Sequence, residues 1–142
     1  MIHNLGHVAL GVKDINRSKE FYCDLLGMEV IMEFDITDDR IGRVVGVVEA
    51  KCKIVHLKLG QGILELFEYS NPKGQNKARS MQQYDHGFTH ICFEVSDFHK
   101  HIDQLKAHDV EFLSEPVEFR PNVWVAYFRG PDSEVCEFRQ AD

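Results

Sequence analysis

Short stretches in which apolar and polar residues alternate predict strands along the first half of the chain, because successive strand side chains point to opposite faces of a sheet. Four stretches have this pattern: residues 5–12, 28–34, 52–59 and 61–69. The last two flank Gly60-Gln61-Gly62, which predicts a hairpin turn. Between the first two, apolar residues at helical spacing predict a helix from its N-cap Asp14 to about Leu26, with Gly27 as the C-cap glycine.

The second half of the chain repeats this order of elements. Strands are predicted over residues 89–95, 110–113, 122–128 and 134–139, with a helix over 97–108 and a turn over 130–133. His7 and His90 lie 83 positions apart, and the same spacing separates Asp14 from Asp97. This internal repeat predicts an α+β fold of two tandem βαβββ modules, which form a curved mixed sheet with a concave inner face and the helices outside.

A polar segment separates the two predicted modules. Module one covers about 1–70, module two about 87–142, and residues 71–86 form a crossover with one predicted helical turn over 77–84. Residues 35–40 are also polar and predict a loop. With 142 residues, 44% of them hydrophobic, the chain is predicted to be a single domain with a buried core.

Charge and cysteine content narrow the class of partner and the compartment. Sixteen Lys and Arg against 23 Asp and Glu give a net charge of −7, which disfavours nucleic acid and anionic membranes as partners. No apolar run approaches the roughly 18 residues of a membrane span or resembles a signal peptide. The four cysteines are widely spaced and form no C-x-x-C pair, so free thiols in the cytoplasm are expected.

Each predicted module places one histidine and one glutamate at equivalent positions. Strand alternation turns His7 and His90 away from the helix-facing apolar residues and toward the concave face. Glu65 and Glu137 interrupt the apolar pattern of the last strand of each module. Taken singly, a half-buried histidine or an edge glutamate is ordinary, but two imidazoles and two carboxylates that converge need a cation or a shared hydrogen-bond network. The set suits a divalent transition metal with positions left for water.

At these residues the chain resembles the vicinal oxygen chelate superfamily, also known as the glyoxalase/bleomycin resistance protein/dioxygenase superfamily. The resemblance spans almost the whole chain and rests on HVALGVKD (7–14), FYCDLLG (21–27), LEL (64–66), THICFEV (89–95) and GPDSEVCEF (130–138). It implies that the metal-ligand positions fall on His7, Glu65, His90 and Glu137. One divalent ion, Ni, Co, Zn or Mn, is implied for each site.

The same resemblance implies a metal-dependent lyase or isomerase that is similar to glyoxalase I, the lactoylglutathione lyase. Such an enzyme transfers a proton next to a carbonyl through a metal-bound enediolate, with Glu65 or Glu137 as the catalytic base. The substrate is expected to be a small α-carbonyl compound or a thioester. A racemase similar to methylmalonyl-CoA epimerase is one alternative, and a non-catalytic protein that sequesters a small molecule such as a drug is another.

Four more side chains are candidates for substrate binding, because alternation places them near the predicted ligands. They are Phe67, Tyr69, Cys92 and Arg139. Ordinary packing is the alternative for the two aromatic residues and for the cysteine, and a solvated strand end is the alternative for the arginine. A homodimer is also expected, because paired modules leave sheet edges and an apolar flank exposed.

Overall fold

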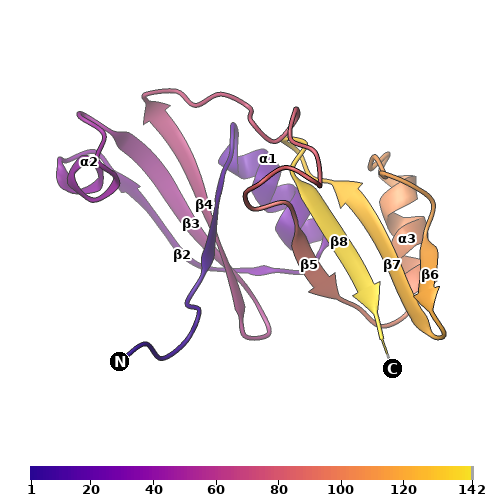
Figure 1. The fold of residues 1–142 in the computed structure, drawn as a ribbon. Coiled ribbons are helices and arrows are strands. Elements are labelled where there is room, and N and C mark those ends of the chain that lie inside the picture. Colours follow the sequence, from indigo (N-terminus) through magenta and orange to yellow (C-terminus); the bar gives the residue numbers. More distant parts are fainter. Residues whose placement is uncertain (142) are drawn as a thin grey trace. The chain divides into compact units, whose positions relative to one another are not determined.

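The computed structural model describes residues 1–141 and divides into two compact units, Met1–Asn76 and a second unit that begins at Lys77. Each unit contains a four-stranded mixed sheet whose first strand is followed by a helix (Figure 1). The predicted α+β fold of two tandem βαβββ modules is confirmed. No helix within residues 1–141 is long and apolar enough to cross a membrane.

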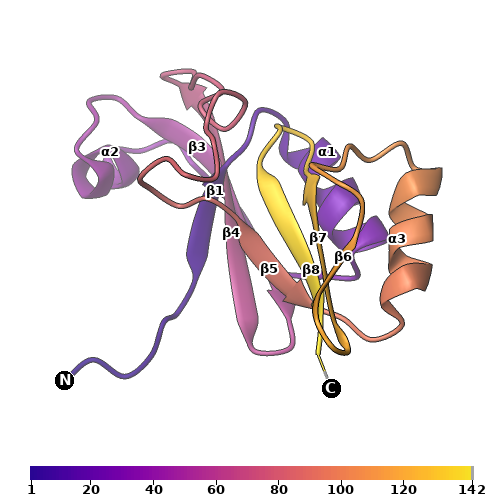
Figure 2. The same ribbon diagram turned by 45° about the vertical axis from the view of Figure 1, so that its right-hand side comes forward.

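The first unit contains four strands in the spatial order β1-β4-β3-β2. Its elements are β1 (Val8–Gly11), α1 (Ile15–Lys19), the π-helix η1 (Glu20–Leu25), β2 (Glu29–Ile36), α2 (Arg40–Val45), β3 (Lys51–Leu59) and β4 (Gly62–Asn71). Strand β1 runs parallel to β4 (Figure 2), and the other neighbouring strands are antiparallel.

A tight turn fixes the register of the β3–β4 hairpin. Only two residues separate Leu59 from Gly62, which face each other, and Gly60 takes the left-handed conformation that the turn requires (φ 57°). Counting back from this turn pairs His56 with Glu65. Paired residues of an antiparallel hairpin share one face of the sheet, so these two side chains must lie side by side.

Two strand-borne side chains hold the helix N-termini of the two units in the same way. Asp14 accepts hydrogen bonds from the first turn of α1, as its predicted N-cap role requires, and Glu68 Oε2 accepts one from Ile15 N at 2.8 Å. In the second unit Gln140 Oε1 accepts from Phe98 N, also at 2.8 Å. Both acceptors stand on the last strand of their unit, so each helix is tied to the strand that carries the candidate glutamate.

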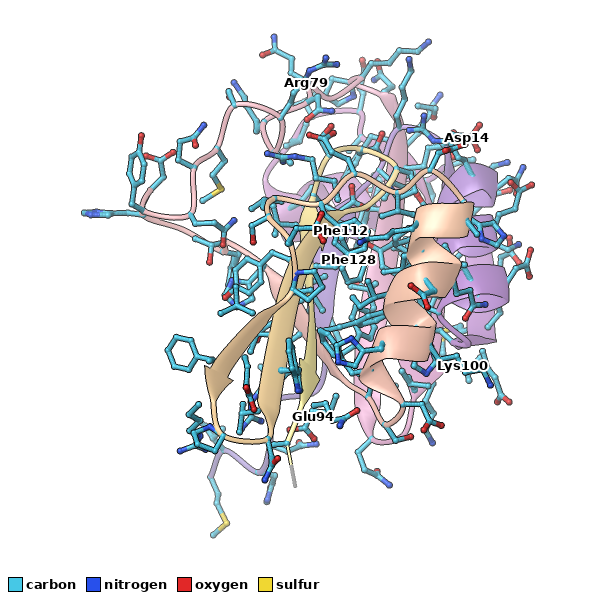
Figure 3. The ribbon with its side chains drawn as sticks, turned by 90° about the vertical axis from the view of Figure 1, so that its right-hand side faces the viewer. Asp14, Arg79, Glu94, Lys100, Phe112 and Phe128 are labelled. Atoms are coloured by element: carbon cyan, nitrogen blue, oxygen red, sulfur yellow. The ribbon has the colours of Figure 1, made fainter. Side chains whose placement is uncertain are left out.

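The second unit has the corresponding strand order, β5-β8-β7-β6. Its elements are β5 (Ile91–Glu94), α3 (Phe98–Ala107), β6 (Val117–Arg120), β7 (Val123–Arg129) and β8 (Val135–Gln140). Its core is aromatic: Phe128 is fully buried, and its ring centroid lies 4.6 Å from that of Phe138 and 6.0 Å from that of Phe112 (Figure 3). Close aromatic contacts of this kind add to the stability gained by burial.

Several predicted boundaries were wrong. Residues 35 and 36 extend β2, and the polar segment then leads into α2, which begins at Arg40 and buries Ile41 against β3. The strand predicted over 110–113 is reduced to a single bridge between Phe112 and Phe128, and β6 is the fourth strand instead. Residues 77–84 form turns rather than a helical turn. Both candidate histidines lie one residue before their strands, β1 and β5.

Candidate functional site

In the first unit the structure brings His7 and Glu65 together. The parallel pairing of β1 with β4 sets Val8 opposite Leu64 and Ala9 opposite Glu65, so the residue before β1 reaches the glutamate. His7 Nε2 lies 3.4 Å from Glu65 Oε1. The Glu65 side chain is only 12% exposed, whereas that of His7 is 46% exposed. A carboxylate this buried requires polar partners, and the first of them is this imidazole.

The second partner of Glu65 is His56, which our sequence interpretation gave no role. His56 stands directly across the β3–β4 hairpin, and its Nε2 contacts Glu65 Oε2. The two carboxylate oxygens therefore face two different imidazoles, whose ring centroids lie 5.7 Å apart. The signal was present in the sequence, because the two-residue turn after Leu59 fixes the pairing of His56 with Glu65.

In the second unit the structure brings His90 and Glu137 together. His90 Nε2 lies 3.1 Å from Glu137 Oε2, and the glutamate side chain is 11% exposed. Tyr127 stands opposite Glu137 across the β7–β8 hairpin, with its hydroxyl 3.4 Å from His90 Nε2. Burial, and next the nearby Glu137 charge, raise the pKa of the Tyr127 hydroxyl, so this group remains a hydrogen-bond donor at neutral pH. Tyr127 was also missed from the sequence.

Gln83, from the predicted crossover, determines which nitrogen of His90 faces the glutamate. Its amide Nε2 donates to the Thr89 carbonyl at 3.0 Å, and this bond turns the amide oxygen toward His90 Nδ1, 3.2 Å away. An amide oxygen only accepts, so the hydrogen bond to Gln83 requires a proton on Nδ1, and the Thr89 hydroxyl oxygen, 3.0 Å from the same nitrogen, can accept it as well. In the neutral ring the lone pair of Nε2 then points at the Glu137 carboxylate. Two electron-rich atoms 3.1 Å apart are a suitable pair of donors to one metal ion.

Cys92 lies beside the same glutamate, opposite Glu137 in the register of β5 with β8. Although Cys92 is exposed, desolvation by the surrounding protein, and next the Glu137 charge, raise the pKa of this thiol to about 11. The thiol is therefore protonated at neutral pH. In this state it is a hydrogen-bond donor to Glu137 rather than a nucleophile.

The other predicted substrate-binding residues already have protein partners. Phe67 and Tyr69 stack with ring centroids 5.7 Å apart, and both pack on a buried cluster of Ile41, Ala50, Cys52 and Ile54. Desolvation by burial is the main cause that raises the pKa of the Tyr69 hydroxyl. Arg139 Nη1 donates to Glu94 Oε1 at 3.1 Å, across the β5–β8 pairing. The substrate-binding roles of Phe67, Tyr69 and Arg139 stay predictions.

The donor atoms fit a divalent transition metal in kind, since each unit supplies one imidazole and one carboxylate. Within residues 1–141, no three His, Cys, Asp or Glu side chains are grouped so that they could hold a metal ion. His7 and His56 approach different oxygens of Glu65. In the first unit His56 is thus a direct side-chain partner of Glu65.

Comparison with known proteins defines the class to which this fold and these residues belong. The family model described as the Glyoxalase/Bleomycin resistance protein/Dioxygenase superfamily matches residues 4–138. The chain therefore belongs to this superfamily.

Curated relatives within the superfamily include two kinds of enzyme. The chain is 29% identical to lactoylglutathione lyase of Pseudomonas aeruginosa, over 95% of this chain and 81% of that protein. It is 30% identical to glyoxalase I of Saccharomyces cerevisiae, over 94% of this chain and 43% of that protein. It is 29% identical to human mitochondrial methylmalonyl-CoA epimerase, over 80% of this chain and 58% of that protein. The chain thus spans less than half of the yeast relative and under two thirds of the human one.

Solved structures share the fold. A glyoxalase family protein from Bacillus cereus superposes with a TM-score of 0.91 at 18% identity, over 99% of this chain and 95% of that chain. The trypanothione-dependent glyoxalase I of Leishmania major superposes with a TM-score of 0.72 at 22% identity, over 98% of this chain and 87% of that chain. At these identities the likeness extends to the fold alone.

Proposed function

We propose that this protein is a divalent-metal-dependent lyase or isomerase that moves a proton next to a carbonyl group. The observation that carries the proposal is the pairing of a histidine with a buried glutamate in each of two repeat-related units: His7 with Glu65, and His90 with Glu137. A fold alone would not support a reaction, since one fold hosts many chemistries. The repeated pair of histidine and glutamate supports a reaction, because it can supply both metal ligands and a base.

We infer that His7 and Glu65 in the first unit, and His90 and Glu137 in the second, are ligands of a divalent ion, Ni, Co, Zn or Mn. Imidazole and carboxylate donors suit such an ion, and the remaining coordination positions are open to water or substrate. When bound, such an ion polarises the oxygen of a substrate carbonyl and stabilises negative charge there. The hydrogen bond from His90 Nδ1 to Gln83 supports this assignment, because metal-ligating imidazoles commonly donate their other N–H to a carbonyl oxygen.

The proton transfer itself falls to the protein's carboxylates. Glu65 or Glu137 accepts the proton from the carbon next to the carbonyl and returns it, either to the neighbouring carbon or to the opposite face of the same carbon. The first outcome is the isomerisation that underlies a glyoxalase-like reaction, and the second is an epimerisation. Both carboxylates are largely buried, and restricted water access favours transfer to and from substrate over exchange with solvent.

The relatives favour two substrate classes, and both have a sulfur atom next to the reacting region. Lactoylglutathione lyase relatives point to an α-carbonyl compound joined to a thiol, and methylmalonyl-CoA epimerase relatives point to an acyl thioester. The first reaction is our leading assignment, because the P. aeruginosa enzyme aligns with 95% of this chain.

The test is metal analysis of untagged protein followed by a turnover screen. Protein stripped with EDTA is reconstituted with Ni²⁺, Co²⁺, Zn²⁺ or Mn²⁺, dialysed and analysed alongside Glu65→Ala and Glu137→Ala. Glu115→Ala, which removes an exposed carboxylate that pairs with Lys106, is the matched control. We expect one metal per chain in wild type and the control, and loss of the metal in both site variants. Full retention of metal in either site variant would contradict the assignment of that glutamate as a ligand.

Turnover is then measured with methylglyoxal plus glutathione and with methylmalonyl-CoA. Conversion of either substrate that disappears on chelation supports the enzyme and identifies its branch. The alternative of a non-catalytic binder predicts small-molecule binding that survives chelation without turnover, and that result would replace our proposal.

A further inference from the structure

Both oxygens of Glu65 are occupied by imidazoles, but the two imidazoles play different parts. His7 faces Oε1 from the residue before β1, whereas His56 contacts Oε2 from the neighbouring strand β3. We propose that His56 is a positioning residue, which holds Oε2 so that Glu65 presents Oε1 to the metal in one fixed orientation. This inference rests on the proposed metal-dependent function.

The hydrogen bond runs from histidine to glutamate. An ionised carboxylate has only acceptor sites, so the proton between the two groups belongs to His56 Nε2. With the side chains of His56 and Glu65 only 18% and 12% exposed, water competes weakly for either partner. A charge-assisted hydrogen bond in such surroundings is stronger than a neutral one, and it restricts rotation of the carboxylate about its last bond.

Backbone geometry makes this contact unavoidable. His56 and Glu65 are directly opposed in the β3–β4 hairpin, and the tight turn at Gly60 leaves no slack for a shift of register. A shift of one residue would turn His56 to the other face of the sheet, among buried leucines such as Leu57 and Leu64. Packing of those leucines therefore holds the imidazole against the carboxylate.

The second unit shows that a different contact is possible at the equivalent position. Tyr127 opposes Glu137 as His56 opposes Glu65, yet its hydroxyl lies 3.4 Å from His90 Nε2. In the first unit the cross-strand residue His56 thus contacts Glu65, and in the second unit the cross-strand residue Tyr127 also approaches His90. The repeat has diverged at this position, since an imidazole stands opposite the glutamate in the first unit and a phenol in the second.

Cobalt affinity tests this role directly. The dissociation constant for Co²⁺ is measured by competition with a chromophoric chelator, and the d–d absorption of the bound ion reports ligand geometry. His56→Phe keeps a ring but removes the donor, and we expect it to weaken Co²⁺ binding by roughly 10- to 100-fold, the usual cost of losing such an outer partner. His56→Gln keeps an N–H donor near the Nε2 position and should stay within about threefold of wild type on the same scale.

The matched control and a double variant separate positioning from general damage. His108→Ala removes an exposed imidazole at the end of α3 and should bind Co²⁺ as wild type does. If His56 acts through Glu65, adding His56→Phe to Glu65→Ala should cause no further loss, because interacting residues are non-additive. Circular dichroism and thermal unfolding of the metal-free proteins verify that each variant is folded.

Each outcome of these measurements either supports or contradicts the positioning role of His56. Wild-type affinity and an unchanged d–d spectrum in His56→Phe would overturn the inference, as would equal further weakening in the Glu65→Ala background. If His56→Phe does not fold, His56→Gln decides, since more than a tenfold loss with a donor still present would also overturn the role. Failure of the wild-type protein itself to bind Co²⁺ would instead refute the proposed metal-dependent function, and the role of His56 with it.

Discussion

Glu68 offers a sharp test of how the first unit is held together. This residue stands on β4, three positions after Glu65 and on the opposite face of the sheet, and it accepts a hydrogen bond from Ile15 N at 2.8 Å. The N-terminal N–H groups of a helix have no partner inside the helix, so an acceptor from another element is needed. Replacement of Glu68 by alanine removes that acceptor and with it this hydrogen bond between β4 and α1.

The size of the effect follows from the type of bond. A hydrogen bond to a charged group contributes roughly 1.5–3 kcal/mol, and a carboxylate at a helix N-terminus adds about 0.3–1 kcal/mol more. Because Glu68 is half-buried and Asp14 still binds the next two N–H groups, we expect a loss of about 2 kcal/mol for Glu68→Ala. For a chain of this length that corresponds to a decrease in Tm of roughly 6 °C.

Urea unfolding followed by circular dichroism measures the change in the free energy of unfolding, provided that the slope with urea stays constant. Glu68→Gln keeps a neutral acceptor and should lose only about 0.5–1 kcal/mol. The second unit supports this expectation, because Gln140 makes the equivalent bond to Phe98 N at the same 2.8 Å. A loss below about 0.5 kcal/mol in Glu68→Ala, or equal losses in the two variants, would refute the reasoning.

Two further predictions concern Cys92 and the oligomeric state. Because its pKa is about 11, Cys92 in metal-free protein should react with iodoacetamide about tenfold faster for each pH unit between 8 and 10. The reaction should be faster in Glu137→Gln at each pH, because loss of the Glu137 charge lowers the thiol pKa. A reaction rate that levels off below pH 9 would contradict this prediction. Four apolar side chains of the edge strand β2 are between 37% and 48% exposed: Val30, Ile31, Met32 and Phe34. We therefore expect a homodimer, for which light scattering gives twice the chain mass of 16.4 kDa, and we expect Ile31→Glu to be a monomer. A monomeric wild-type protein would contradict this prediction.

The repeat could be recognised from the sequence because it is built from local signals. Turn glycines, an N-cap aspartate and two-residue alternation predicted both hairpins and both main helices, and Gly27 has the left-handed conformation (φ 81°) that its predicted C-cap position requires. The π-helix η1, which continues α1, was not predicted, since nothing in its composition separates it from an α-helix.

Two elements were missed for a physical reason. Helix α2 has only six residues, and the burial of Ile41 against β3 supports it, so its stability depends on a contact distant in sequence. Strand β6 has four residues, all of them exposed, so it lacks the alternation of buried and exposed positions that reveals a strand. It is defined by its pairing with β7.

In the candidate site, too, some features were predictable from the sequence and others depended on tertiary packing. The sequence by itself determined that a histidine and a glutamate occur in each module at repeat-related places, because strand periodicity and an internal repeat are properties of the chain. Only the tertiary structure decided which atoms meet. His56 and Tyr127 approach the pairs through cross-strand register, and Gln83 through a loop without periodicity. Such contacts depend on where distant segments pack, and for this reason the sequence predicted the ligands but not the residues that orient them.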